Sequence, residues 1–178
     1  MTDTTKLTPL QQRFVLTWGE MGARWGINRT VAQIHALLFL SEPPLDAETI
    51  ASTLGVARSN VSTSLRELQG WGIVRVTHVL GDRRDRFESL KDVWEMFRII
   101  VDERKKREID PVLGMLRDAA ADAKKPAAAD AYTRERLSDM LQFFELMTRW
   151  TESTRKLPTP AVVRMVRMGD RLAKALGV

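Results

Sequence analysis

The chain has 178 residues, of which 44% are hydrophobic and 29% are charged, and its formal net charge is +5. This size and balance predict one or two globular modules, and the positive charge favours an anionic partner without identifying it. The lack of cysteine excludes disulfides and thiolate chemistry, and it makes the cytoplasm the simplest location. The longest apolar run, Ala36 to Leu40, is far shorter than the roughly 20 residues that cross a bilayer, so no membrane partner is expected.

Two amphipathic helices are predicted before residue 44. Apolar residues recur at helical spacing from Pro9 to Trp25, and Pro9 suits a first helical turn that follows the capping residue Thr8. A second apolar stripe predicts a helix from Arg29 to Leu40, which the Pro43-Pro44 pair ends. The glycines in and beside the first helix indicate close helix packing, because no strand or phosphate-loop lysine accompanies them.

A helix-turn-helix is predicted after the proline pair. Asp46 is an N-cap residue for a short helix that Gly55 stops. A second helix then starts near Arg58 and runs to about Gln69. Two short helices joined by a tight turn that contains glycine are typical of DNA-binding proteins, although enzymes and helical bundles contain such pairs as well.

The second helix of this pair has an apolar face and a polar face. Val61, Leu65 and Leu68 share the apolar stripe, which predicts that the opposite face is exposed. That face offers short hydrogen-bonding side chains and arginines, which suit the base edges and phosphates of a major groove. The candidate DNA contacts on this helix are Arg58, Ser59, Asn60, Ser62, Thr63 and Arg66.

A β-hairpin is predicted next, from a β-branched strand over residues 73–79, a turn over 81–86 and a return strand over 87–90. Such a hairpin is a wing, and an arginine at a narrow tip suits the electronegative minor groove. Residues 58–87 hold a net charge of +3 out of the formal +5. An alternative is that these charges only solvate an exposed turn and pair with one another. The candidate wing residues are Asp82, Arg83, Arg84 and Arg86.

The stretch from Leu45 to Leu90 resembles the MarR superfamily of winged-helix regulators, specifically its GbsR-like branch. The residues that carry the resemblance are Leu-Asp-x-Glu-x-Ile-Ala from Leu45, Leu-Gly-Val-x-Arg-x-x-Val-Ser from Leu54, Gly72-Ile73-Val74 and Gly81-Asp82-Arg83-Arg84. The resemblance implies a homodimer that binds operator DNA, usually as a repressor, and sometimes responds to a small molecule. It also implies that the helix starting near Arg58 enters the major groove. The wing contact would be Arg84 or Arg83, with Asp82 as the partner that orients it.

Further helices are predicted beyond the wing. They start near Val93, at Asp110-Pro111 with a kink or a fresh helix, at about Ala131, and after Pro160. Their apolar stripes exceed what a small winged helix can cover, so we expect an isologous homodimer, with a monomeric helical subdomain as the alternative. The predicted fold class is mainly α with a small antiparallel β-hairpin. Residues 1–90 would form a winged helix-turn-helix domain, and residues 91–178 a helical arm for dimerisation and effector binding.

Four tryptophans are candidates for an effector pocket, because aromatic faces can hold a quaternary ammonium ion. The same helical spacing equally fits ordinary core positions. The candidates are Trp18, Trp25, Trp94 and Trp150.

No nucleophile turn or metal-ligand spacing occurs in the sequence, so neither an enzyme nor a cofactor is expected, and His35 and His78 are interpreted as structural. The predicted function is a sequence-specific DNA-binding transcriptional regulator, a dimeric repressor modulated by a small molecule. The alternative is a winged-helix module that mediates protein contacts in a transcription or RNA-handling assembly.

Overall fold

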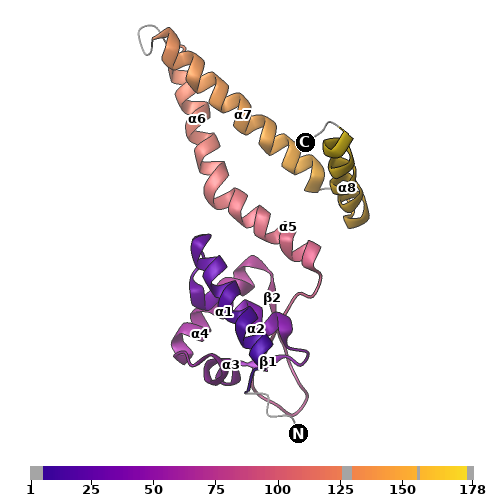
Figure 1. Cartoon of the computed structure of the whole chain (residues 1–178). Coiled ribbons are helices and arrows are strands. Elements are labelled where there is room, and N and C mark those ends of the chain that lie inside the picture. The colour runs from indigo at the N-terminus through magenta and orange to yellow at the C-terminus, as the bar shows by residue number, and fades with distance from the viewer. Residues whose placement is uncertain (1–5, 126–129, 156, 176–178) are drawn as a thin grey trace. The chain divides into compact units, whose positions relative to one another are not determined.

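The computed structural model describes residues 6–125, 130–155 and 157–175. It divides the chain into two compact units, unit 1 (Met1–Ile100) and unit 2 (Val101–Val178) (Figure 1). The described residues are mainly helical and contain one small antiparallel sheet, which confirms the predicted fold class. Within these ranges, no helix is both long enough and apolar enough to cross a membrane.

Unit 1 contains the four predicted helices, α1 (Pro9–Arg24), α2 (Arg29–Leu40), α3 (Ala47–Leu54) and α4 (Arg58–Trp71). A capping box starts α1: the hydroxyl of Thr8 accepts the N–H of Gln11 at 3.3 Å, and the Gln11 side chain accepts the N–H of Thr8 at 2.9 Å. Gly55 ends α3 with φ +65°, a left-handed conformation that glycine adopts without strain. The predicted end of α4 at Gln69 is early, because Gly70 stays helical and the left-handed Gly72 ends the helix.

The sheet has three strands, β1 (Leu45–Asp46), β2 (Val74–Thr77) and β3 (Arg86–Ser89), in the order β1-β3-β2. Both pairings are antiparallel, and they place Leu45 and Val76 on either side of Phe87. We call the hairpin formed by residues 74–89 the wing. The sequence did not predict β1, and the return strand begins at Arg86 rather than Phe87. Arg86 therefore lies in a strand and not at the tip of the wing, where it was predicted.

The core of unit 1 is formed by buried side chains of α1 to α4 and of the sheet, together with Met96. Its fully buried side chains include Ile34 of α2, Ile50 of α3 and Leu65 of α4. Burying each of these side chains contributes about 1.5–3 kcal/mol relative to exposing it. The apolar stripe predicted for α4 is confirmed, because Val61, Leu65 and Leu68 are each at most 2% exposed. This packing fixes which side of α4 faces solvent.

Unit 2 is helical in its described residues. The helix α5 (Val93–Arg104) crosses the division between the units and continues through a short π-helix, η1 (Lys105–Ile109), into α6 (Asp110–Asp122). The helices α7 (Ala131–Arg155) and α8 (Thr159–Ala175) follow. Leu113 and Leu116 of α6 are buried, and Arg117 of α6 pairs with Glu145 of α7 at 3.2 Å. A new helix does start at Asp110, as predicted, but it continues from η1 without a break.

Candidate nucleic-acid interface

The polar face of α4 is exposed along its first two and a half turns. All six residues predicted there are solvent-exposed, while Val61, Ser64 and Leu65 of the same turns are buried. The side chain of Arg66 lies back along the helix, with its Nε 3.4 Å from the carbonyl oxygen of Ser62 and its Nη2 3.3 Å from the hydroxyl of Thr63. The exposed face therefore presents hydroxyl, amide and guanidinium groups. The buried face of the same helix holds it in place against the core.

The first turn of α4 has no side-chain cap. Its N-cap residue is Ala57, which offers no acceptor to the backbone N–H groups of the first turn. These N–H groups and the positive end of the helix dipole point out of the same end as Arg58 and Ser59. That end can therefore accept an anionic oxygen.

Asp82 organises the two arginines that follow it in the wing. Its carboxylate accepts the backbone N–H of Arg84 at 3.1 Å, and it accepts the Nε and Nη2 of the same arginine at 3.0 Å each. It also accepts the Nη2 of Arg86 at 2.8 Å. These hydrogen bonds, first those of Arg84 and then those of Arg86, hold the pKa of Asp82 well below its usual value.

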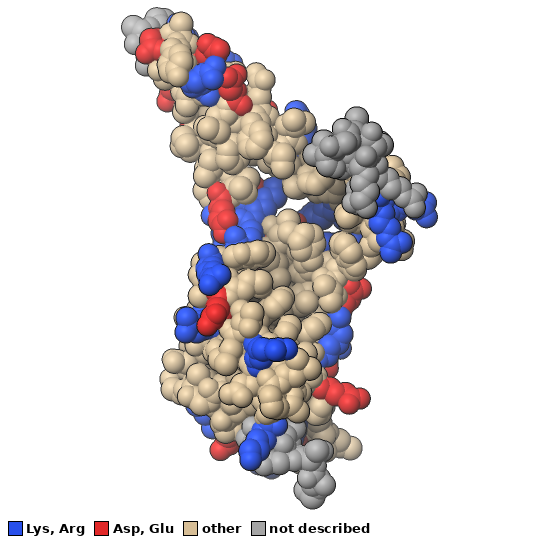
Figure 2. Space-filling view, viewed as in Figure 1, with Lys and Arg blue, Asp and Glu red and all other residues tan. Residues whose placement is uncertain are grey.

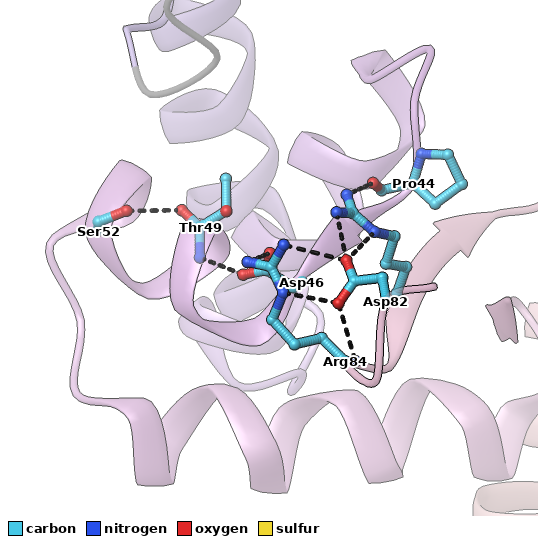
Figure 3. A network of polar contacts seen from close by, with 7 residues as sticks. Pro44, Asp46, Thr49, Ser52, Asp82 and Arg84 are labelled. Atoms are coloured by element: carbon cyan, nitrogen blue, oxygen red, sulfur yellow. Dashed lines mark hydrogen bonds and ion pairs between the residues drawn. The ribbon is translucent and has the colours of Figure 1, made fainter. Parts of the chain in front are cut away.

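Arg84 has a second acidic partner outside the wing. Its Nη1 donates to the Oδ2 of Asp46 at 2.9 Å, while the Oδ1 of Asp46 accepts the N–H of Thr49 at 2.8 Å and so caps α3 (Figure 3). A guanidinium has five N–H donors. In Arg84, three of them bind carboxylates among the described residues. Two donors remain, on a side chain that is 57% exposed.

Arg86 and Arg83 differ in how far they reach solvent. The guanidinium of Arg86 faces inward, binding Asp82 and donating to the carbonyl oxygen of Pro44 at 3.4 Å, and 26% of its side chain is exposed. Arg83 is exposed. Of the three arginines predicted at the tip, the structure thus exposes Arg83, holds Arg84 in place with its outer edge exposed, and uses Arg86 to fasten the wing.

Burial and hydrogen bonding act in opposite directions on Asp46. Burial raises its pKa, but the hydrogen bonds from Thr49 and the charges of Arg84 and Arg86 outweigh burial, so the pKa lies below its usual value. Asp82 in turn raises the pKa of Arg84. Both carboxylates are consequently ionised at physiological pH.

Charge alone does not mark a DNA-binding surface. Figure 2 shows Lys and Arg side chains interspersed with acidic and uncharged ones on the face of unit 1 that it presents. Within the wing, Arg75 pairs across the strands with Glu88 at 2.6 Å. The candidate interface is therefore defined by the exposed side of α4 and by Arg83 and Arg84.

The four predicted pocket tryptophans have different surroundings. Trp18 stacks on Phe14 with ring centroids 5.4 Å apart and packs against the core of unit 1. Trp25 and Trp150 are more than half exposed, and Trp94 packs edge-on to Phe97 at 6.4 Å. The surroundings of Trp18 accordingly fit a core residue better than a residue of an aromatic ligand cage.

A hollow of about 260 Å³ lies in unit 2 between α6 and α7. Its lining is mostly charged and contains none of the four tryptophans; Lys105, Asp110 and Glu152 form ion pairs there. Nowhere in the described ranges do three or more acidic or histidine side chains gather in a group that could hold a metal ion.

Sequence reasoning missed the link between the wing and α3. Asp46 was identified as the cap of α3, and Asp82 as the partner of a wing arginine, but neither motif indicates that Arg84 binds both. Asp46 and Arg84 are separated by 38 positions, so only the pairing of β1 with β3 brings them together. Nor does any pattern in the sequence indicate that the carbonyl oxygen of Pro44 accepts a hydrogen bond from Arg86.

The chain is similar in sequence and in fold to proteins described as transcriptional regulators. A family model described as the MarR family matches residues 16–85, a range that includes α4 and the tip of the wing. The HTH-type transcriptional repressor GbsR of Bacillus subtilis (strain 168) is 21% identical over 121 residues, which cover 68% of this chain and 67% of the relative. The crystal structure of a transcriptional regulator, 21% identical, has the same fold. It superimposes with a TM-score of 0.60 over 83% of this chain and 96% of that one.

Proposed function

Because the chain belongs to the MarR superfamily of transcriptional regulators, we propose that it binds double-stranded operator DNA through α4 and the wing. The observation that carries the proposal is the orientation of α4, whose buried apolar stripe leaves a continuous hydrogen-bonding face exposed. The chain is a regulator and not an enzyme, in agreement with the lack of catalytic motifs in its sequence.

We assign α4 to the major groove. Asn60 can donate to and accept from the edge of an adenine, and the hydroxyls of Ser59, Ser62 and Thr63 can bind bases or phosphates. The uncapped N–H groups beside Arg58 would bind a backbone phosphate and so fix the register of the helix. Arg66, two turns along, would extend from its position on Thr63 to a further phosphate or base.

We assign the wing to the minor groove. The two remaining N–H donors of Arg84 match the acceptors that A·T pairs present there, and a narrow groove concentrates negative potential around a cation. Arg83 would bind the adjacent phosphates. Asp82 and Arg86 would act through Arg84 by holding it, and not by touching DNA themselves.

We further propose that the protein acts as a homodimeric repressor. The described residues of α7 and α8 expose many large apolar side chains, which a second copy could cover; they include Met140, Phe143, Leu146, Trp150, Val166 and Met168. A two-fold dimer would read two half-sites about 34 Å apart on the DNA. The similarity to a protein named a repressor supports this sign of regulation.

A small-molecule effector completes the proposal. The hollow between α6 and α7 offers both signs of charge to a polar compound, and the tryptophans that remain exposed, Trp25, Trp94 and Trp150, stay candidates for an aromatic contact. A regulator that binds DNA works in the compartment that holds the DNA, and we therefore propose a cytoplasmic location.

The test is a fluorescence-anisotropy titration with DNA from immediately upstream of the gene and with scrambled DNA, at near-physiological salt. We expect nanomolar affinity, two subunits per site and a clear ratio of specific to scrambled binding. Arg84→Ala should weaken binding and reduce the dependence on salt, whereas Arg134→Ala, which removes the same charge from α7, should change neither. Equal binding by wild type and Arg84→Ala would overturn the wing assignment. No binding to any DNA would favour a module for protein contacts.

A further inference from the structure

The carboxylate of Asp46 connects two parts of the candidate interface. Its Oδ1 caps α3 through the N–H of Thr49 at 2.8 Å, and its Oδ2 accepts the Nη1 of Arg84 at 2.9 Å. Only 6% of the side chain is exposed, so the carboxylate faces the protein and cannot itself reach a ligand. One buried acid is thus shared by the start of the helix-turn-helix and by the arginine that extends from the wing.

The chain around Asp46 fastens the wing at further points (Figure 3). Asp46 pairs with Arg86 in the antiparallel ladder of β1 and β3, and the Nη1 of Arg86 donates to the carbonyl oxygen of Pro44 at 3.4 Å. Asp82 joins Arg84 to Arg86 from the other side. Contacts from residues 44–46 therefore reach both arginines of the network.

We infer that Asp46 is a positioning residue for DNA recognition, one that fixes the place of Arg84 relative to α4. The inference rests on the proposed function, in which Arg84 enters the minor groove while α4 occupies the major groove. Arg84 and α4 can contact the DNA at the same time only if the distance between them matches the distance between the two grooves. An arginine held by two carboxylates also loses less side-chain freedom on binding than a free one does.

The two oxygens of Asp46 allow this role to be separated from helix capping. The cap uses Oδ1, and the Arg84 contact uses Oδ2. Serine is about as good an N-cap residue as aspartate, but it has a single oxygen and no charge. The Asp46→Ser variant should therefore keep the start of α3 and lose the hold on Arg84.

Asp130 provides a matched control. It caps α7 in the same Asp-x-x-Thr arrangement and accepts the N–H of Thr133 at 2.7 Å, but in the described structure it has no hydrogen bond to an arginine. Asp130→Ser removes the same charge and keeps the same kind of cap, in unit 2. Both variants should unfold at nearly the same temperature as the wild type.

The experiment measures operator binding of both variants, of Arg84→Ala and of the double variant Asp46→Ser/Arg84→Ala. We expect Asp46→Ser to bind the operator about tenfold more weakly and with a lower ratio of specific to scrambled binding, and Asp130→Ser to match the wild type. If Asp46 acts through Arg84, the double variant binds no more weakly than Arg84→Ala alone. Independent, multiplicative losses in the double variant, or unchanged binding by Asp46→Ser, would overturn the inference.

Hydrogen exchange of the wing separates failure of this inference from failure of the proposed function. If the wild type binds no DNA, the function fails, but the hold on the wing can still be measured in the free protein. Amides in residues 79–86 should exchange several-fold faster in Asp46→Ser than in Asp130→Ser, because the wing has lost one of its fastenings. Equal exchange in the two variants would show that Asp46 does not position the wing.

Discussion

The Nε2 atom of His35 on α2 lies 3.0 Å from the sulfur of Met96 on α5, inside the core of unit 1. His35 is 3% exposed, and its ring also lies near those of Trp18 and Phe39. Burial, and then the charge of Lys91, lowers the pKa of His35 from 6.5 to about 4. The imidazole is therefore neutral at physiological pH and packs as part of an aromatic and thioether cluster.

This buried imidazole should make the protein sensitive to mild acid. The pKa is lower in the folded state, so the unfolded chain takes up a proton first as pH falls, and stability is lost between about pH 6.5 and pH 4. Lowering the pH from 7.5 to 5 should remove about 2 kcal/mol through this residue alone. In urea unfolding at the two pH values, His35→Leu should lose less stability than the wild type by about that amount. The exposed His78→Leu should behave as the wild type, and an equal loss in all three proteins would contradict the prediction.

Lys91 should stabilise the end of α2. Its ammonium donates to the carbonyl oxygens of Leu38, Phe39 and Ser41 at 2.8, 2.9 and 2.8 Å, which are among the carbonyls that the helix end leaves without a helical partner. Lys91→Met keeps the stem and removes the donor, and we expect it to lower the free energy of unfolding by about 1–3 kcal/mol. The control Lys106→Met removes a lysine that is exposed and pairs with Glu103 three residues away, and it should cost much less. Chemical denaturation of the two variants decides between these outcomes.

Close packing of α1 on α2 should make Gly22 intolerant of a methyl group. A Cβ at this position would lie 2.5 Å from the Cβ of Ala32, so Gly22→Ala should force the helices apart and destabilise the protein by about 1–3 kcal/mol. At the helical Gly114, a Cβ would meet nothing within 4 Å, so Gly114→Ala should stabilise by about 0.5–1 kcal/mol. Thermal melts measure both changes. Adding Ala32→Gly to Gly22→Ala should restore part of the loss, and an unperturbed Gly22→Ala would refute the clash.

The exposed face of α4 should determine base preference. Asn60→Ala or Thr63→Ala should relax discrimination at particular base pairs, because each removes a hydrogen-bonding group from the side of the helix assigned to the groove. Arg84→Ala should instead lower affinity for most sequences to a similar degree. Binding to a series of operators with single base-pair changes distinguishes the two patterns. If Asn60→Ala and Thr63→Ala left every base preference unchanged, α4 would not be reading bases.

Local patterns were sufficient to predict most of unit 1. The helical periodicity, the capping residues and the β-branched run predicted α1 to α4 and the wing with small errors at their ends. The bonds of Lys91 to α2 were not predictable, because they join residues about 50 positions apart. The two-residue strand β1 is too short to leave a pattern, and its pairing with β3 depends on the rest of the fold. For the same reason the sequence predicted Arg86 as a residue of the wing tip, whereas tertiary contacts turn it inward.

The contacts of Lys91 and Met96 bear on how unit 1 could be studied in isolation. A shortened chain that stops after Leu90 would keep α4 and the wing, but it would lack the ammonium on the carbonyls of α2 and the sulfur beside His35. A fragment that extends to Ile100 would retain both, together with the apolar contacts of Ile99 and Ile100 with the core. The smallest excised fragment that keeps its own core therefore includes the first two thirds of α5, up to Ile100.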